Sequence, residues 1–281
     1  MSGKFLARAS ALSLALFLAA CGGDENSADL TEVGDPPTPL TDVDQEINEP
    51  AAGDTDVPTE SAALPLLPGY YSTKVVTGGS EFTGATILDP EGRFRTFIPD
   101  TDLTYGVLEG LSEGQISGQG RNIVYDGSSW QKNTGVLTGS ASDKSNATLS
   151  LESNTTDYQS EVSIARVPEY SDITITLEDI SGTFLMQQPG WLTTEITVQE
   201  DGSISGNDES GCIFTGEANI PNLSYSVLRV SFIASNCGDT ELAGAEQRNG
   251  AYAGLGIFVG GDQLIVFASN DTVPAYFNGL K

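Results

Sequence analysis

Short runs in which apolar and polar residues alternate recur along most of the chain, and turns rich in Gly, Asp and Asn separate them. Alternation with a period of two places successive side chains on opposite faces of a β-strand. Residues 194–198 alternate in this way before an Asp201-Gly202 turn, and Ala147, Leu149 and Leu151 share one face of another run. The pattern predicts an all-β fold of short antiparallel strands.

Other segments refine this expectation. Leu228, Val230 and Phe232 fall on one face of a predicted strand, with Tyr225 and Val227 on the other. Residues 264–267 form a nearly continuous apolar run, which is typical of a strand covered on both faces. Residues 170–180 place apolar side chains at period two, so we expect a linking strand there. We expect no long helix after the N-terminal apolar segment.

The two halves of this β-rich region resemble each other. Landmarks recur in the same order at offsets of 105 to 115 residues: Gly69-Tyr-Tyr with Gly182-Thr-Phe, residues 90–92 with 200–202, 106–110 with 211–216, 135–139 with 250–254, and 148–151 with 263–266. We therefore predict two related antiparallel β-domains, barrel-like or sandwich, at residues 69–166 and 182–281, with a connector at 167–181.

Residues 1–20 have the composition of a secretory signal peptide. Lys4 and Arg8 precede an apolar stretch at residues 11–20. As a helix, ten residues rise about 15 Å, half the thickness of a bilayer core, so this segment is too short to span a membrane.

The residues at its end, Leu18-Ala19-Ala20-Cys21-Gly22, resemble the lipobox of bacterial lipoproteins. This resemblance implies cleavage before Cys21, a diacylglycerol on its thiol and a further acyl chain, such as palmitate, on its new amine. It also implies a cell-envelope location, because Gly22 favours sorting to the outer membrane of a Gram-negative cell. The membrane is then a partner through the lipid anchor.

The segment that follows is strongly acidic. Residues 22–68 hold 12 acidic residues and no basic or aromatic one, and prolines are scattered through them. Low hydrophobicity with high net charge disfavours folding, so residues 21–68 are predicted to be the lipidated cysteine and a disordered linker. Such a chain spans roughly 35–40 Å on average.

Composition excludes several functions. The chain has 39 acidic and 12 basic residues, a net charge of −27 and no His. Nucleic-acid binding needs clustered Lys and Arg, and Ser-His-Asp, Cys-His or His-metal chemistry needs histidine. We expect no nucleic-acid partner, cofactor or metal site.

Cys212 and Cys237 remain as a pair once Cys21 is lipidated. In an oxidising compartment such a pair predicts a disulfide, and closing a loop of about 25 residues stabilises by about 3 kcal/mol. A reactive thiol would need a nearby cation or helix N-terminus, and the flanking residues offer neither.

The C-terminal half carries a second resemblance. It is similar to uncharacterised envelope lipoproteins of Gram-negative bacteria over residues 182–281, through Asp201, Gly202, Gly211, Cys212, Gly216, Ser235, Asn236, Cys237, Gly250, Tyr252, Gly254 and Phe277. The resemblance implies a compact, barrel-like antiparallel domain and no specific activity.

Candidate chemistry is sparse. Residues 207–210 offer calcium-ligating oxygens but favour a solvated turn between strands, and residues 143–146 favour a loop over a Ser-Lys dyad. The aromatic residues either cover the ends of a β-core or stack on sugars or peptides: Tyr70, Tyr71, Trp130 and Trp191.

Two function classes follow. The first is a lipid-anchored, non-enzymatic binding module whose acidic domains attract a cationic protein partner, although acidity also serves solubility. The second is a carrier that holds a small apolar ligand inside one barrel, and interior space distinguishes it from the first. A purely structural envelope role is a further alternative, and no enzyme is expected.

Overall fold

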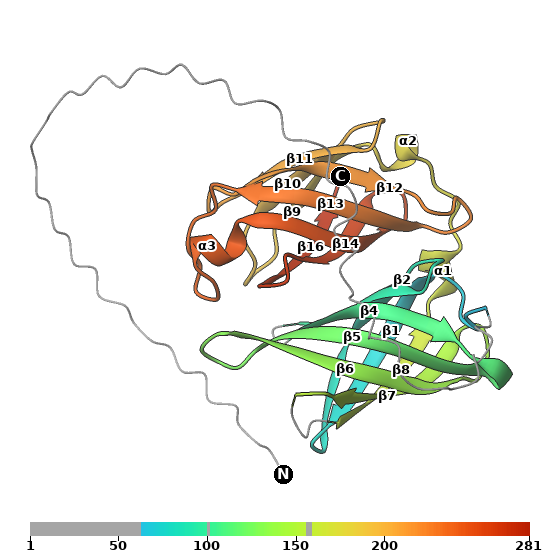
Figure 1. Ribbon diagram of the computed structural model, residues 1–281. Coiled ribbons are helices and arrows are strands. Elements are labelled where there is room, and N and C mark those ends of the chain that lie inside the picture. Colours follow the sequence, from blue (N-terminus) through green and yellow to red (C-terminus); the bar gives the residue numbers. More distant parts are fainter. Residues whose placement is uncertain (1–62, 100–101, 156–158) are drawn as a thin grey trace, which may run out of the picture. The chain divides into compact units, whose positions relative to one another are not determined.

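The computed structural model describes residues 63–99, 102–155 and 159–281. The predicted signal peptide, Cys21 and residues 22–62 of the predicted linker lie outside the described residues. The described chain is nearly all β, and its strands form two closed eight-stranded antiparallel barrels (Figure 1).

Barrel 1 is an up-and-down meander in which each strand pairs with the next and β8 returns to β1. Its strands are β1 (Gly69–Thr77), β2 (Ser80–Leu88), β3 (Arg93–Ile98), β4 (Asp102–Gly110), β5 (Gln115–Tyr125), β6 (Trp130–Ala141), β7 (Asn146–Ser153) and β8 (Gln159–Arg166). A short 3-10 helix (Ser112–Gly114) joins β4 to β5.

Barrel 2 has the same topology, closed by the pairing of β16 with β9. Its strands are β9 (Gly182–Met186), β10 (Thr194–Val198), β11 (Ser203–Asp208), β12 (Ile213–Asn219), β13 (Val227–Ser235), β14 (Gly250–Val259), β15 (Gln263–Ser269) and β16 (Pro274–Leu280). The helix α3 (Ala245–Arg248) lies in the β13–β14 connection. Closing each sheet on itself leaves no exposed sheet edge.

The linking strand predicted at residues 170–180 is wrong. Two one-turn helices occupy the connection, α1 (Pro168–Ser171) and α2 (Leu177–Ile180). Pro168 begins α1, and a capping box between Thr176 and Asp179 begins α2, in which Thr176 Oγ1 accepts from the Asp179 N–H. Ile175 is buried in the core of barrel 2, and Ile173 and Leu177 are partly buried against it, so their period-two spacing came from packing and not from strand pairing.

The predicted duplication is confirmed by matching hydrogen bonds. Gly92 and Gly202 end equivalent β-turns at φ +82° and +89°, and their carbonyls accept from the amides of Leu108 and Ala218, each at 2.8 Å. A side chain at either glycine would collide with the backbone: a Cβ would lie 2.2 Å from the Leu108 carbonyl oxygen at Gly92 and 2.5 Å from that of Ala218 at Gly202. The turn therefore requires glycine in both halves.

Three of the five sequence matches are out of register. In barrel 1 Phe94 pairs with Gly106, and in barrel 2 the equivalent residue Ile204 pairs with Gly216. Gly106 therefore corresponds to Gly216 and not to Gly211. In the same way Gly139 corresponds to Gly256, since these pair with Ile116 and Leu228 respectively. The third is the match of 148–151 with 263–266: Leu149 pairs with Gly139 as Val266 pairs with Gly256, so Leu149 corresponds to Val266 and not to Leu264. The repeated Gly-x-x-x-Gly spacing in one chain offers several alignments that only strand pairing can distinguish.

The interior of each barrel follows the predicted alternation. Leu228, Val230 and Phe232 face the interior of barrel 2, while Val227 belongs to a different cluster. That cluster lies on the outer faces of both barrels and includes Ile257, Ile265 and Phe267 of barrel 2 with Ile87, Phe97 and Leu103 of barrel 1. Residues 264–267 are apolar at every position because β15 is covered on both faces, as predicted.

Each barrel is closed at one end by the segment that precedes its first strand. In barrel 1 this segment includes Leu66, which is buried in the core, so the predicted linker gives way to the fold before Pro68. In barrel 2 it is α2, whose Leu177 contacts the region of Gly202. Lys281 also caps this end, where its Nζ donates to the Asp179 carbonyl at 2.7 Å and lies over Phe184 and Phe258.

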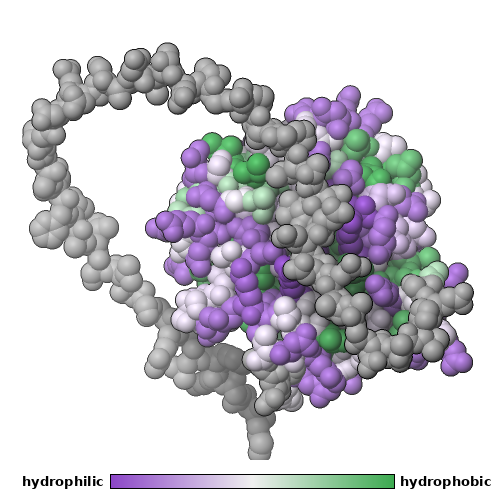
Figure 2. All heavy atoms as spheres, viewed as in Figure 1, coloured by the Kyte–Doolittle hydropathy of each residue, from purple (hydrophilic) through white to green (hydrophobic). Residues whose placement is uncertain are grey.

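Hydrophilic residues are widespread on the face shown in Figure 2, and the hydrophobic ones form separate small patches. Across the ranges that the structure describes, no helix combines the length and apolar character that a membrane crossing requires.

Candidate functional site

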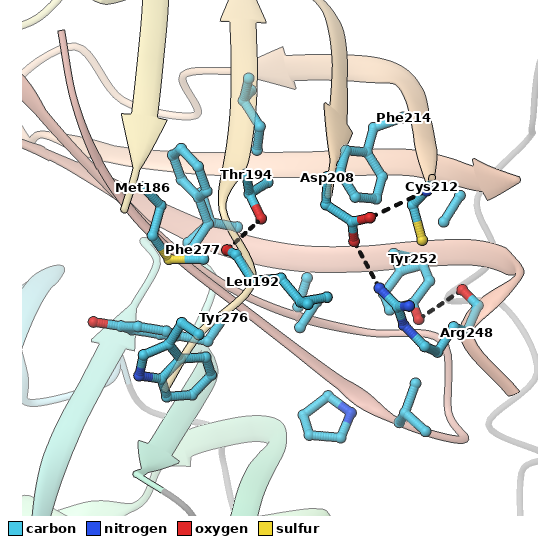
Figure 3. Close-up of a pocket in the computed structure, with 18 of the residues that line it drawn as sticks. Met186, Leu192, Thr194, Asp208, Cys212, Phe214, Arg248, Tyr252, Tyr276 and Phe277 are labelled. Atoms are coloured by element: carbon cyan, nitrogen blue, oxygen red, sulfur yellow. Dashed lines mark hydrogen bonds and ion pairs between the residues drawn. The ribbon is translucent and has the colours of Figure 1, made fainter. Parts of the chain in front are cut away.

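A cavity of about 610 Å³ extends from the interior of barrel 2 through its open end to side chains of barrel 1 (Figure 3). This volume lies within the range of about 300–1,000 Å³ found for small-molecule sites. Inward-facing side chains of all eight strands line it, and they are mainly apolar: Met186, Ile196, Val198, Ile204, Phe214, Ala218, Leu228, Val230, Phe232, Ala234, Tyr252, Leu264, Val266, Ala268 and Phe277.

Comparison with barrel 1 explains part of this space. Residues of the two barrels are equivalent when they occupy the same place in the strand pairing. Leu88, Phe94 and Leu108 lie in the core of barrel 1, and their respective equivalents in barrel 2 are Val198, Ile204 and Ala218. Leu137 is likewise matched by Gly254, since these residues pair with Gly118 and Val230. At each of these positions the smaller side chain of barrel 2 occupies less space than its counterpart in barrel 1.

The remaining large side chains of barrel 2 gather along one wall. Phe214, Phe232 and Tyr252 lie on the neighbouring strands β12, β13 and β14, with ring centroids 5.7 Å apart for the first pair and 4.9 Å for the second. Their counterparts in barrel 1 are Thr104, Gly120 and Gly135 by register. The aromatic wall gives a bound apolar molecule a flat surface to pack against.

The two interiors also differ in polarity. In barrel 1, the hydroxyls of Thr73 and Thr96 each lie 2.7 Å from that of Thr86, and Asn122 Nδ2 donates to Thr104 Oγ1 at 2.9 Å. The matched residues of barrel 2 carry neither a hydroxyl nor an amide group in their side chains: Met186, Gly206, Ile196, Ala234 and Phe214. At these positions the interior of barrel 1 therefore carries hydroxyl and amide groups, whereas the interior of barrel 2 does not.

The loops at one end of barrel 2 form the mouth of this cavity. They lie between β9 and β10, β11 and β12, β13 and β14, and β15 and β16, and contribute Trp191, Glu209, Leu242 and Val273 to the lining. Leu242 is 52% exposed although it lines an apolar cavity. α2 closes the other end, so a ligand enters between these loops.

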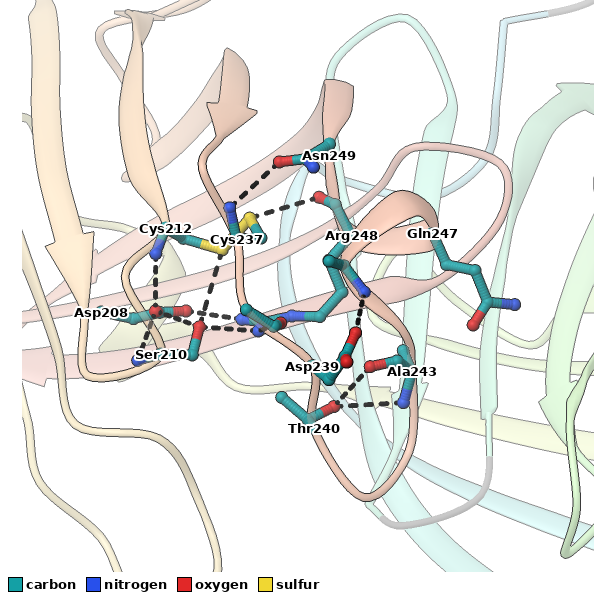
Figure 4. The surroundings of a disulfide bond; sticks show 12 residues. Asp208, Ser210, Cys212, Cys237, Asp239, Thr240, Ala243, Gln247, Arg248 and Asn249 are labelled. Carbon is teal, nitrogen blue, oxygen red and sulfur yellow. Dashed lines mark hydrogen bonds and ion pairs between the residues drawn. A yellow bond between two sulfur atoms is a disulfide. The ribbon is translucent and has the colours of Figure 1, made fainter. Parts of the chain in front are cut away.

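The predicted disulfide between Cys212 and Cys237 is confirmed and lies at this mouth (Figure 4). Cys212 precedes β12 and Cys237 follows β13, and the two strands pair from Ile213 with Ser235 onward. The bond therefore holds the open end of the β12–β13 pair together.

A buried ion pair, which the sequence did not reveal, supports the same loops. Arg248 Nη2 lies 2.6 Å from Asp208 Oδ2, and Arg248 Nη1 donates to Ser210 Oγ and to the Gly238 carbonyl, each at 2.6 Å. Asp208 Oδ1 accepts from the Ser210 and Cys212 amides at 2.9 and 3.1 Å. Asp208 was expected in a solvated turn with calcium as the alternative. The segment is a turn between β11 and β12 with Asn207 and Glu209 exposed, but Asp208 itself is buried and both of its oxygens accept hydrogen bonds.

Tyr252 joins this network at the aromatic wall. Its hydroxyl donates to the Arg248 carbonyl at 2.9 Å, and burial raises the pKa of the phenol above its usual value. The tyrosine therefore stays neutral, with its ring toward the cavity.

Four residues of barrel 1 also line the cavity: Phe97, Asp102, Tyr125 and Trp130. The Phe97 ring stacks on Tyr276 of barrel 2 with centroids 4.7 Å apart, and Trp191 lies 4.7 Å from the same tyrosine. Trp130 Nε1 is buried without a hydrogen-bond partner among the described residues, so this donor is available to a bound molecule.

Asp102 brings an acidic group to the cavity. Burial raises the pKa of its carboxyl to about 7, with a hydrogen bond from Asn122 as a smaller opposing effect. No sequence pattern identified Asp102, because its burial depends on strands distant in the chain.

The other sequence candidates are placed as follows. Tyr71 is fully buried in the barrel 1 core, and Tyr70 packs edge-on against Tyr170, so both have structural roles. Trp130 and Trp191 line the cavity. Asp143 lies in the β6–β7 loop, where it accepts from the Ser145 amide at 2.6 Å, as expected for a loop.

In the described part of the chain, no group of three or more His, Cys, Asp or Glu residues is placed to hold a metal ion.

No protein-family model matches the chain, and no curated protein matches it. Among solved structures, immune modulator A of Aeromonas veronii is similar at 8% identity with a TM-score of 0.36, over 78% of this chain and 97% of that one. A Trp-176-Ala mutant of the vaccine antigen transferrin-binding protein B from Haemophilus parasuis is similar at 9% identity with a TM-score of 0.25, over 77% of each chain. Neither likeness carries an argument about function.

Proposed function

We propose that this chain is a non-enzymatic envelope binding protein whose barrel 2 carries a small apolar ligand. The observation that carries the proposal is the cavity of about 610 Å³ that extends from the interior of a closed, apolar barrel. Apolar surface that a ligand covers there is removed from water at about 25 cal/mol per Å², which favours binding without any charged contact.

The comparison between the barrels supports this choice over a purely structural role. A structural protein gains stability from a filled core, as in barrel 1, and loses it from unfilled space. Replacement of Leu108 by Ala218 and of the threonines by apolar residues makes barrel 2 suited to a guest rather than to its own packing.

The location is part of the same proposal. Cys212–Cys237 is a disulfide of the kind that forms in exported proteins, and the lipobox-like residues around Cys21 would attach the chain to a membrane. The outer membrane of a Gram-negative cell is the location that Gly22 favours.

The carrier function is tested by titration with a neutral apolar fluorophore such as N-phenyl-1-naphthylamine. The full chain with Cys21→Ser is used so that no lipid anchor requires detergent. We expect saturable binding at one site per chain, with a Kd in the micromolar range. Absence of saturable binding to the folded protein would reject the carrier function.

A second function, binding of a cationic protein partner, is favoured by the charge of the folded region. Residues 69–281 hold 27 acidic and 10 basic residues, a net charge of −17. Such a partner would be steered by long-range attraction that salt screens within about 10 Å at 0.1 M. A pull-down from envelope and secreted fractions, repeated at 0.5 M salt, tests it: a partner retained unchanged at high salt would contradict electrostatic recruitment.

A further inference from the structure

The charged residues that line the cavity are unbalanced. Four are acidic, Asp102, Asp208, Glu209 and Glu241, and one is basic, Arg248. Arg248 is committed to Asp208, Ser210 and Gly238, and it is largely buried. An anionic head group therefore finds no available cation among the residues that line the cavity, and it meets several carboxylates.

The aromatic side chains at the mouth are suited to a positive charge. Trp191 and Tyr276 lie 4.7 Å apart, Phe97 stacks on Tyr276, and Tyr125 and Trp130 lie 5.2 Å apart, all of them lining the same cavity as Asp102. Aromatic faces attract cations, and the attraction grows when water is excluded. Asp102 adds a partly buried carboxylate, and a charge pair is stronger there than in water.

Resting on the carrier function proposed above, we infer that the ligand of barrel 2 is an apolar amine: its hydrocarbon body fills the barrel, and its ammonium group lies at the mouth between Asp102 and the aromatic side chains. The strands supply the apolar site and barrel 1 supplies the acidic group. Fatty acids, which many hollow barrels could accommodate by shape alone, are disfavoured by the same charges.

The test compares three probes of equal chain length: decylamine, decanol and decanoate. Each displaces the neutral fluorophore from the full chain with Cys21→Ser at pH 8.5, where the amine is cationic and the Asp102 carboxyl is ionised. We expect decylamine to displace at about tenfold lower concentration than decanol, with decanoate weakest.

Two variants locate the effect. Asp102→Asn should remove most of the advantage of decylamine over decanol while both still bind. Glu109→Gln is the matched control, because Glu109 is an exposed acid on the same strand and does not line the cavity. Should Asp102→Asn fail to fold, Trp191→Leu should reduce the same advantage several-fold through loss of an aromatic face.

The outcomes separate the two proposals. Equal displacement by all three probes, stronger displacement by decanoate, or an amine advantage that survives Asp102→Asn would overturn the amine inference and leave the carrier function standing. Failure of the fluorophore and all three probes to bind would overturn both.

Discussion

The side chain at position 218 determines much of the difference between the two barrels. Ala218 and Leu108 occupy matched positions, since both donate their amides to the turn glycine of the preceding hairpin. Leu108 is buried in a packed core, whereas Ala218 faces the cavity. A difference of a few carbon atoms at such positions converts a core into a binding site.

Ala218→Leu should fill part of the cavity and weaken fluorophore binding at least tenfold, with little loss of stability because the new side chain enters open space. Fluorescence titration and urea unfolding measure both quantities. The reciprocal change Leu108→Ala should cost about 2–5 kcal/mol of stability and leave binding unchanged. Equal effects of the two variants on binding would show that the fluorophore does not occupy barrel 2.

Asp102 is the residue whose ionisation should affect stability. Its pKa of about 7 in the fold lies above the ordinary 3.8, so the folded state binds a proton more tightly than the unfolded state. Stability therefore falls as pH rises from about 4 to about 7 and stays lower above that range.

Asp102→Asn should consequently raise the melting temperature at pH 8 and change it little at pH 4, because the amide is neutral at every pH. Thermal melts at the two pH values, with Glu109→Gln as control, check the difference. A shift of equal size at both pH values would assign the effect to packing and not to ionisation.

At the scale of elements, the pair β12 and β13 depends on the disulfide at its open end. The strands pair from Ile213 to Asn219, and the bond between Cys212 and Cys237 lies just beyond the last pair, at the mouth of the cavity. The adjoining loops are fixed by Asp208 and Arg248.

The double variant Cys212→Ala/Cys237→Ala should lose about 3 kcal/mol of stability. Hydrogen exchange should rise first at the amides of residues 213–215, because the strand end is no longer joined. Wild-type protein treated with reductant should show the same pattern. Exchange that rises evenly over the whole barrel would contradict a local role for the bond.

At the scale of the molecule, a buried ion pair joins the two barrels. Asp89 Oδ2 accepts from Arg229 Nε at 2.8 Å, while Asp89 Oδ1 accepts from the amides of Glu91 and Arg93, each at 2.9 Å. The Asp89 side chain is fully buried. A second arginine contact, to Glu91, lies nearer the surface.

Arg229→Met should cost about 3 kcal/mol, because it leaves a buried carboxylate without its cation. Chemical unfolding checks this value. Trp130 lies in barrel 1 and Trp191 in barrel 2, so the fluorescence of one tryptophan reports the unfolding of its own barrel when the other is replaced by Phe. Lys74→Met is the control: its pair with Glu81 is half exposed on both sides and should contribute less than about 1 kcal/mol. A loss no larger than that of the control would argue against a buried pair.

The proposed membrane anchor belongs to the scale of the whole molecule. Cys21→Ser should move the protein from the membrane to the soluble fraction and lower its mass by that of the attached acyl groups. Fractionation and intact mass measure this. Retention on the membrane with unchanged mass would show that Cys21 carries no lipid.

Local patterns in the sequence predicted the β class, the repeat, the turn at Gly202 with its match at residues 90–92, and the Cys212–Cys237 bond. These features follow from period-two alternation, from turns that only glycine permits, and from the pairing of the last two cysteines. The prediction of a linking strand at residues 170–180 was wrong because it also rested on a local pattern. Apolar residues at period two are equally compatible with a chain that packs across the end of a barrel.

The cavity, the buried pair of Asp208 with Arg248, and the approach of Asp102 and Trp130 to barrel 2 were decided only by the tertiary structure. Each depends on side chains from strands far apart in the chain, and a cavity is the space that none of them fills. Whether Ala218 leaves a void or Leu108 fills a core is set by the register of eight strands around a closed sheet, which no single segment encodes.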